Sequence, residues 1–194
     1  MQSFLARPNN FPTNAFVSCS LRSEDKPFID LIERVLSAHY IQPFGTVGRY
    51  SALPENPALS MRDNIAFADM VVVVATERYL QQDTKTGARS YGLSEMVHVE
   101  SGMAFAMKKP VIVFSKAGTN VGNFLPNITQ YITLTGEQED LDDKWHLINS
   151  LLANAYVFVQ ANKTKKSNKE MGDLVKGVLT VIGFASVFNY LQEG

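Results

Sequence analysis

The chain has 194 residues, a formal net charge of -1 and an apolar content of 45%. This length fits one large domain, or one domain with an appended element, and the composition excludes a disordered chain, a collagen-like repeat and a coiled-coil rod. The near-neutral charge argues against a dedicated nucleic-acid-binding protein. The lone cysteine, Cys19, excludes an internal disulfide, and the three histidines have no paired spacing. We therefore expect a cytoplasmic protein without a metal site or a bound cofactor.

The first half of the chain alternates between strand and helix patterns. We expect strands at Asn14–Cys19, Tyr40–Val47 and Asp69–Thr76, helices at Asp25–His39 and Ala58–Ala68, and a loop at Gly48–Pro57. Ser23 is the expected N-cap of the first helix. Pro43 argues against a central position for the second strand. The unbroken apolar run of the third strand predicts burial on both faces, as in a parallel sheet covered by helices.

The alternation continues to the fifth strand. We expect a long polar loop, a helix, a strand, a second loop, a strand and a helix at Glu77–Gly92, Ser94–Lys108, Pro110–Ser115, Gly118–Asn127, Gln130–Thr135 and Glu139–Ala161. Five strands that alternate with helices predict an α/β fold with a doubly wound parallel sheet. Ligands of such sheets bind beyond the carboxyl ends of the strands.

The C-terminal segment differs from the rest of the chain. A basic linker begins at Lys163, and an apolar helix is expected over Glu170–Leu191, so we divide the chain into domains 1–162 and 163–194. The apolar tract Gly177–Leu191 is shorter than the about 20 residues that span a membrane, which predicts no stable membrane span. Because this helix is apolar around most of its circumference, it must be covered, and we expect a homo-oligomer.

Glu100 interrupts the apolar face of the helix expected at Ser94–Lys108. With residues placed about 100° apart, this face holds Met96, Val97, Val99, Met103, Ala104, Ala106 and Met107. A carboxylate against a core is costly unless it is paired, protonated or next to a cavity. Glu100 therefore either lines a ligand cleft with a raised pKa, or forms a salt bridge with Arg22 or Arg62, or reaches solvent. Gly102 suggests close packing against a neighbouring backbone.

Two family resemblances meet at this glutamate. Ala15–Ser20 resembles the first box of Toll/interleukin-receptor (TIR) domains, and Ser94–Glu100 is similar to the TIR segment S-x-W-[VC]-x-x-E, with Met96 at the tryptophan position. The resemblance implies a flavodoxin/TIR-like sheet, with Glu100 as the catalytic residue that cleaves the nicotinamide–ribose bond of NAD.

The second resemblance concerns the stretch that begins at Glu100. Glu100–Val111 resembles the E-x-G-x-A-x-A-x-x-K-P-V stretch of nucleoside 2-deoxyribosyltransferases, in which the nucleophilic glutamate comes first. Those transferases usually carry an acidic residue after the third strand, where this chain has Thr76. Both families break an N-glycosidic bond, where one carboxylate can stabilise charge or attack the sugar without a metal.

The leading hypothesis is a TIR-like enzyme that takes NAD as its substrate, in bacterial antiphage immunity. Catalysis is assigned to Glu100, and the residues assigned to substrate binding are Ser18, Ser20, Arg22, Arg49, Tyr50 and Ser94. Arg22 is expected to meet the diphosphate, because a helix N-terminus also favours anions.

Four of the six residues assigned to binding have a simpler interpretation. Ser18 could be a core serine bonded to backbone, Arg22 a solvated helix-start residue, and Arg49 and Tyr50 ordinary loop residues. Cys19 is expected to be a small core residue. Two other functions stay open: a nucleoside or nucleotide deoxyribosyltransferase or N-glycosidase, and a non-enzymatic domain that senses nucleotides or assembles.

Overall fold

The computed structural model describes residues 12–45, 57–129 and 131–165. The chain separates into two compact units, Met1–Tyr156 and Val157–Gly194. The sequence-based division after residue 162 stays a prediction, because most of the linker and the last helix lie outside the described residues. Arg49 and Tyr50 lie outside them as well. Within the described residues, no helix is long and apolar enough to cross a membrane.

A parallel sheet of five strands forms the centre of the first unit, as the sequence predicts. The strands are β1 (Thr13–Ser18), β2 (Ile41–Phe44), β3 (Met70–Ala75), β6 (Val111–Lys116) and β8 (Tyr131–Leu134). They lie in the order β2-β1-β3-β6-β8, which confirms the doubly wound α/β fold. The strand with Pro43 is an edge strand, as its missing backbone donor requires. All residues of β1 and β3 are buried, because both faces of the sheet are covered.

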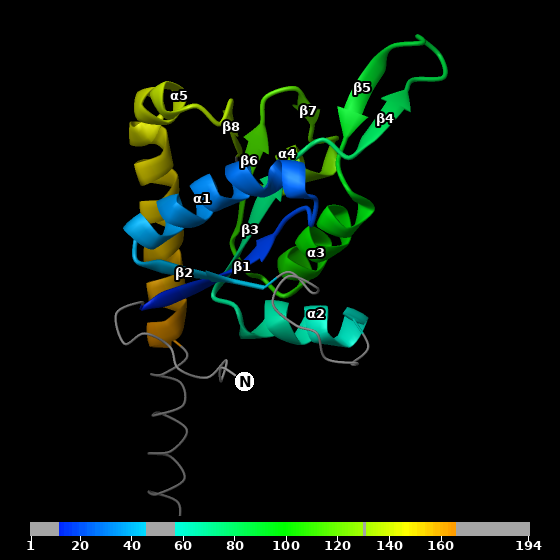
Figure 1. Ribbon diagram of the computed structural model, residues 1–194. Coiled ribbons are helices and arrows are strands. Elements are labelled where there is room, and N and C mark those ends of the chain that lie inside the picture. The colour runs from blue at the N-terminus through cyan, green and yellow to red at the C-terminus, as the bar shows by residue number, and fades with distance from the viewer. Residues whose placement is uncertain (1–11, 46–56, 130, 166–194) are drawn as a thin grey trace, which may run out of the picture. The chain divides into compact units, whose positions relative to one another are not determined.

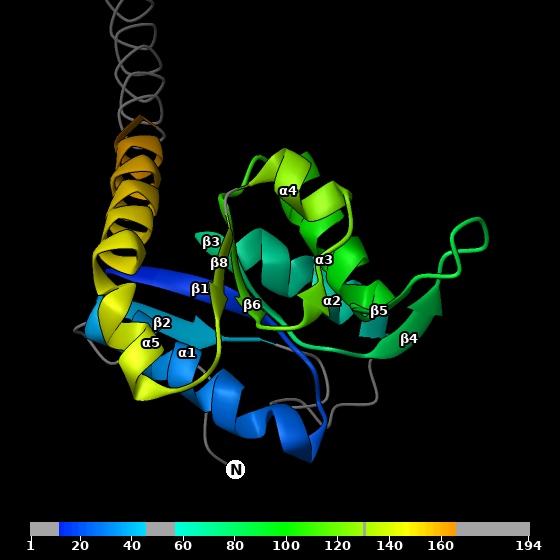
Figure 2. The ribbon, with the colours of Figure 1, turned by 90° about the horizontal axis from the view of Figure 1, so that it is seen from above.

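Helices cover both faces of this sheet. They are α1 (Lys26–Ala38), α2 (Pro57–Phe67), α3 (Glu95–Ala106), α4 (Phe124–Ile128) and α5 (Gln138–Asp143), and helical conformation resumes over 145–165. Side chains of α2, α3 and α4 form one core with Phe16, Val71, Val73 and Val113 of the sheet. The apolar side of α1 lies on the opposite face (Figures 1 and 2).

The expectation of a loop at Glu77–Gly92 is wrong, because most of this segment forms a β-hairpin. The strands β4 (Tyr79–Gln82) and β5 (Arg89–Gly92) are antiparallel, and β5 pairs with the short β7 (Thr119–Asn120). Figure 1 shows the hairpin projecting away from the main sheet. All four residues of β4 are exposed, so backbone pairing rather than burial forms it and no apolar alternation marks it. Asp83 closes the turn by accepting the backbone N–H groups of Lys85 and Thr86.

Three smaller expectations are also wrong. The loop Gly118–Asn127 contains β7 and most of α4. The helix expected at Glu139–Ala161 is interrupted by a turn at Lys144. Ser23 starts a 3-10 turn (Ser23–Asp25) instead of capping α1, whose N-cap is Asp25.

Gly45 is a position where the fold requires glycine. Its φ is +107°, and an added Cβ would lie 2.3 Å from Cδ2 of the buried Phe16. We expect Gly45→Ala to lower the free energy of unfolding by about 2–4 kcal/mol, from backbone strain and overpacking together. Gly87→Ala is the matched control, because Gly87 also has a positive φ but its nearest atom is 3.9 Å away. Denaturant unfolding of both variants separates the two causes, and equal losses would contradict the packing contribution.

Candidate functional site

The candidate site lies where the parallel strands end. In the order β2-β1-β3, the chain winds to one side after β1 and to the other after β3. Ligands of doubly wound sheets bind at such a switch point, beyond the carboxyl ends of the strands. Ser18 is the last residue of β1, and Thr76 directly follows β3. Both side chains are buried, which places two hydroxyl groups at this edge.

Ser18 and Glu100 meet across this edge. The Ser18 hydroxyl donates a hydrogen bond to Oε2 of Glu100, although 82 positions separate the two residues in sequence. Ser18 is fully buried and Glu100 is 6% exposed. The interpretation of Ser18 as a serine bonded to backbone is therefore replaced by a direct contact with the carboxyl group.

Helix α3 turns a different side toward the core than the sequence predicts. Its buried residues are Val97, Glu100, Ser101 and Ala104, whereas Met96 and Val99 are about half exposed. Because α3 is apolar on nearly every side, its periodicity does not select the buried face. The buried Ser101 is tolerated because its hydroxyl donates to the backbone oxygen of Val97 at 2.6 Å.

The Glu100 carboxyl is buried without a cation among the described residues. Arg22 pairs with Asp25, and Arg62 pairs with its neighbour Asp63, so the expected alternative of a structural salt bridge is wrong. In the described part of the chain, Thr119 Oγ1 is the one fully enclosed side-chain polar atom that has no hydrogen-bond partner. Oε1 of Glu100 is not such an atom, so it is not fully enclosed without a partner. The carboxyl thus has one oxygen, Oε2, bound by Ser18 and a second, Oε1, that is not fully enclosed.

Burial determines the ionisation of Glu100. Loss of hydration raises the pKa of its carboxyl from 4.5 to about 7, and the hydrogen bond from Ser18 acts in the opposite direction. A charged group in a poorly hydrated site is disfavoured, whereas a donor that faces its oxygen favours the charged form. The carboxyl therefore changes charge near neutral pH, a property common among groups in catalytic clefts.

Arg22 does not have the free guanidinium that a diphosphate would need. Its Nε donates to Oδ2 of Asp25 at 3.0 Å, and its terminal nitrogen donates to the backbone oxygen of Glu77. Glu24 adds a second carboxylate at 3.4 Å. Asp25, three residues along the chain, is 4% exposed and was not singled out in the sequence. The i, i+3 spacing of Arg22 and Asp25 was the signal that could have revealed this pair.

The remaining residues that the sequence singled out differ in what their side chains contact. Ser20 accepts the backbone N–H of Arg22 through its hydroxyl, so it shapes the loop after β1. Ser94 is the N-cap of α3, but its side chain makes no capping hydrogen bond. Cys19 is partly buried. Gly102 does not pack against a neighbouring backbone, because an added Cβ would meet only the Phe124 side chain at 3.9 Å.

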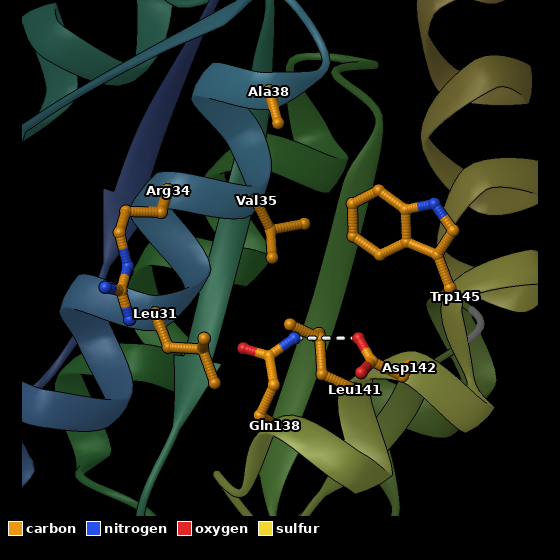
Figure 3. A pocket seen from close by; sticks show the side chains of 8 residues that line it. All are labelled: Leu31, Arg34, Val35, Ala38, Gln138, Leu141, Asp142 and Trp145. Atoms are coloured by element: carbon orange, nitrogen blue, oxygen red, sulfur yellow. Dashed lines mark hydrogen bonds between the residues drawn. The ribbon is translucent and has the colours of Figure 1, made fainter.

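A separate groove lies between α1 and α5. It has a volume of about 480 Å³ and is lined by Leu31, Arg34, Val35, Ala38, Gln138, Leu141, Asp142 and Trp145 (Figure 3). The amide of Gln138 donates to Asp142 at 2.7 Å at one side of it. The lining residues do not include Ser18 or Glu100, so this groove is not part of the candidate site.

Comparisons with known proteins give structural similarity only. No protein-family model and no curated protein matches the chain. A CMP N-glycosidase from Clostridium botulinum is 16% identical over 69% of this chain and 98% of its own, with a TM-score of 0.45. A 2-deoxyribosyltransferase from Bacillus psychrosaccharolyticus is 18% identical over 61% of this chain and 85% of its own, with a TM-score of 0.43.

A third similar structure is described as an enzyme of another class. It is a flavoenzyme NAD(P)H:acceptor oxidoreductase from Paracoccus denitrificans, 12% identical over 77% of this chain and 98% of its own, with a TM-score of 0.43. None of the three is a TIR domain. A fold does not determine an activity, so the chemistry of this chain has to be argued from its side chains.

The raised pKa of Glu100 predicts a pH-dependent loss of stability. Between pH 4.5 and about 7 the folded protein keeps a proton that the unfolded chain releases, so stability falls as the pH rises through this window. Above pH 7, the free energy of unfolding is lower by on the order of 3 kcal/mol, because each pKa unit corresponds to about 1.4 kcal/mol. We expect Glu100→Gln to unfold like the wild type at pH 4.5 and to be more stable by that amount at pH 8.5.

The measurement is denaturant unfolding at the two pH values. Glu95→Gln, on the exposed side of the same helix, is the control and should change the free energy of unfolding by less than about 1 kcal/mol at either pH. A Glu100→Gln effect of the same size at both pH values would contradict the assignment of a desolvated carboxyl.

Proposed function

We propose that this protein is an enzyme that breaks the N-glycosidic bond of a nucleoside or nucleotide, with Glu100 as its catalytic residue. The observation that carries the proposal is the buried Ser18–Glu100 pair at the carboxyl edge of the sheet. The resemblance of Glu100–Val111 to the glutamate stretch of nucleoside 2-deoxyribosyltransferases also supports it. The products are a free base and a sugar that passes to water or to a second base.

Glu100 acts in its ionised form. Ser18 holds Oε2, so Oε1 is the oxygen that meets the anomeric carbon. As the bond from C1′ to the base breaks, its electron pair leaves with the base nitrogen, and positive charge develops on C1′ and the ring oxygen. Oε1 then stabilises that charge or forms a bond to C1′, which water or a second base later displaces.

A nucleoside fits the site better than NAD, which the sequence analysis placed first. Cleavage of NAD requires a site for its diphosphate, and Arg22 was the residue expected to bind it. Its guanidinium is instead occupied by Asp25 and the Glu77 carbonyl, with Glu24 nearby. These carboxylates oppose the approach of a second anion. The antiphage setting and the homo-oligomeric state stay predictions.

The test of this proposal is base release. Purified protein is incubated with ribo- and deoxynucleosides and their monophosphates, with and without a second free base, and with NAD in a separate reaction. We expect a free or exchanged base by chromatography, and a loss of about a thousandfold or more in kcat for Glu100→Gln.

The matched control is Ser115→Ala. Ser115 is also a buried serine at the end of a central strand, but its hydroxyl pairs with Thr133 at 2.8 Å. This variant should keep base release. Base release that survives Glu100→Gln, or a protein that consumes NAD alone, would contradict the proposal.

Activity should depend on pH through Glu100. Because the carboxylate is the active form, kcat/KM should rise with pH and level off above about 7. Ser18→Ala removes the hydrogen bond that lowers the pKa of Glu100, so the rise should move to higher pH. Ser115→Ala should leave the midpoint in place. A midpoint that is unchanged in Ser18→Ala would contradict the role given to the Ser18 hydroxyl.

A further inference from the structure

Arg22 connects the loop after β1, the strand of Ser18, with the linker after β3. Arg22 lies in the loop after β1, four positions beyond Ser18. Its guanidinium donates to the backbone oxygen of Glu77, in the linker between β3 and β4. This contact spans 55 positions of sequence and connects the ends of two neighbouring strands.

The linker that Arg22 contacts is joined to the segment before α3, the helix of Glu100, at the base of the β4–β5 hairpin. The backbone N–H of Arg78 donates to the Gly92 oxygen at 2.8 Å, which closes the base of the hairpin. Gly92 is followed by Leu93 and by the N-cap of α3. On its other side, the Glu77 carboxyl lies against Gly118, where an added Cβ would come within 2.7 Å of Oε1. The start of α3 is therefore joined, through the base of the hairpin, to a segment that Arg22 binds.

Arg22 is also fixed within its own loop, the one that follows β1. Asp25, which is 4% exposed, accepts a hydrogen bond from Nε of Arg22 at 3.0 Å and forms an ion pair with its terminal nitrogen at 2.9 Å. The Ser20 hydroxyl accepts the backbone N–H of Arg22 at 3.2 Å. A planar guanidinium can make these bonds together because its donors have a fixed fork geometry, which lysine lacks.

We propose that Arg22 is a positioning residue, which ties the loop after β1 to the segment leading into α3 and so keeps the Ser18 hydroxyl on Glu100. This role takes its purpose from the proposed function, because it prepares the carboxylate for the sugar. Arg22 is not among the groups that shift the ionisation of Glu100 directly. Its influence therefore passes through the position of Ser18 and not through its own charge.

The experiment follows the Glu100 carboxyl and does not require turnover. Proteins labelled with ¹³C in the glutamate carboxyls are titrated by NMR, with Glu100→Gln used to assign the signal. Arg22→Met should raise the pKa of Glu100 by about half a unit, a threefold change in its ionisation constant, as Ser18→Ala does. In the Ser18→Ala background, Arg22→Met should add nothing. Arg62→Met, which removes an exposed arginine paired with Asp63, should leave the pKa in place.

Two results would overturn the proposal. An unchanged pKa in Arg22→Met, with only a lower free energy of unfolding, would make Arg22 purely structural. A shift of equal size in the Ser18→Ala background would show that Arg22 does not act through Ser18. If Arg22→Met does not fold, because Asp25 is left buried and unpaired, Arg22→Lys keeps that charge and loses the fork, and the same criteria apply. A protein without base release but with the expected titration would refute the proposed function and retain the positioning role.

Discussion

The hydrogen bond between Ser18 and Glu100 is the interaction on which the candidate site depends. It joins the end of a central strand to the middle of a helix that packs against the sheet. Burial of a carboxyl without a cation is unfavourable, and one neutral hydroxyl offsets only part of the lost hydration. The fold therefore keeps Glu100 in a state where a proton is gained or lost near neutral pH. A carboxyl in bulk water, or one paired with an arginine, would stay ionised at that pH and would also be less available to a sugar.

The topology explains how residues so distant in sequence meet. Parallel strands with right-handed crossovers bring all their carboxyl ends to one edge. The buried strands are paired in a fixed register: Phe16 of β1 lies beside Val71 of β3, which lies beside Val111 of β6. The strands that carry the site therefore have little freedom to slip. The sequence predicted this sheet correctly because unbroken apolar runs can be buried only between two layers of helices. It did not predict the hairpin, because its exposed strand β4 depends on backbone pairing with β5 and on a turn at Asp83.

The sequence singled out both Glu100 and Ser18, but it did not predict their contact or the orientation of α3. Glutamate within an apolar helix breaks the local pattern, and such exceptions are where functional residues are expected. The orientation of the helix could not be obtained from periodicity, because Met96 and Val99 are as apolar as the side that is buried. Packing against the sheet and α2 selects the side with Glu100. The sequence also did not reveal the partner of Arg22, because Asp25 lies only three residues away and pairs with it within the same loop.

Glu100 lowers the stability of the fold, and it lies where the fold can tolerate that loss. The helix that carries the carboxyl packs on a core in which Val71, Val73 and Val113 have no exposed surface, so extensive apolar burial offsets its cost. Natural proteins retain such costs where chemistry requires them. Glutamine in this position could still accept the hydrogen bond of Ser18 and would remove the desolvation of a charge, so packing alone gives no reason for a glutamate here. What glutamine lacks is the negative charge that a breaking glycosidic bond needs. The presence of the acid is therefore better explained by reactivity than by stability.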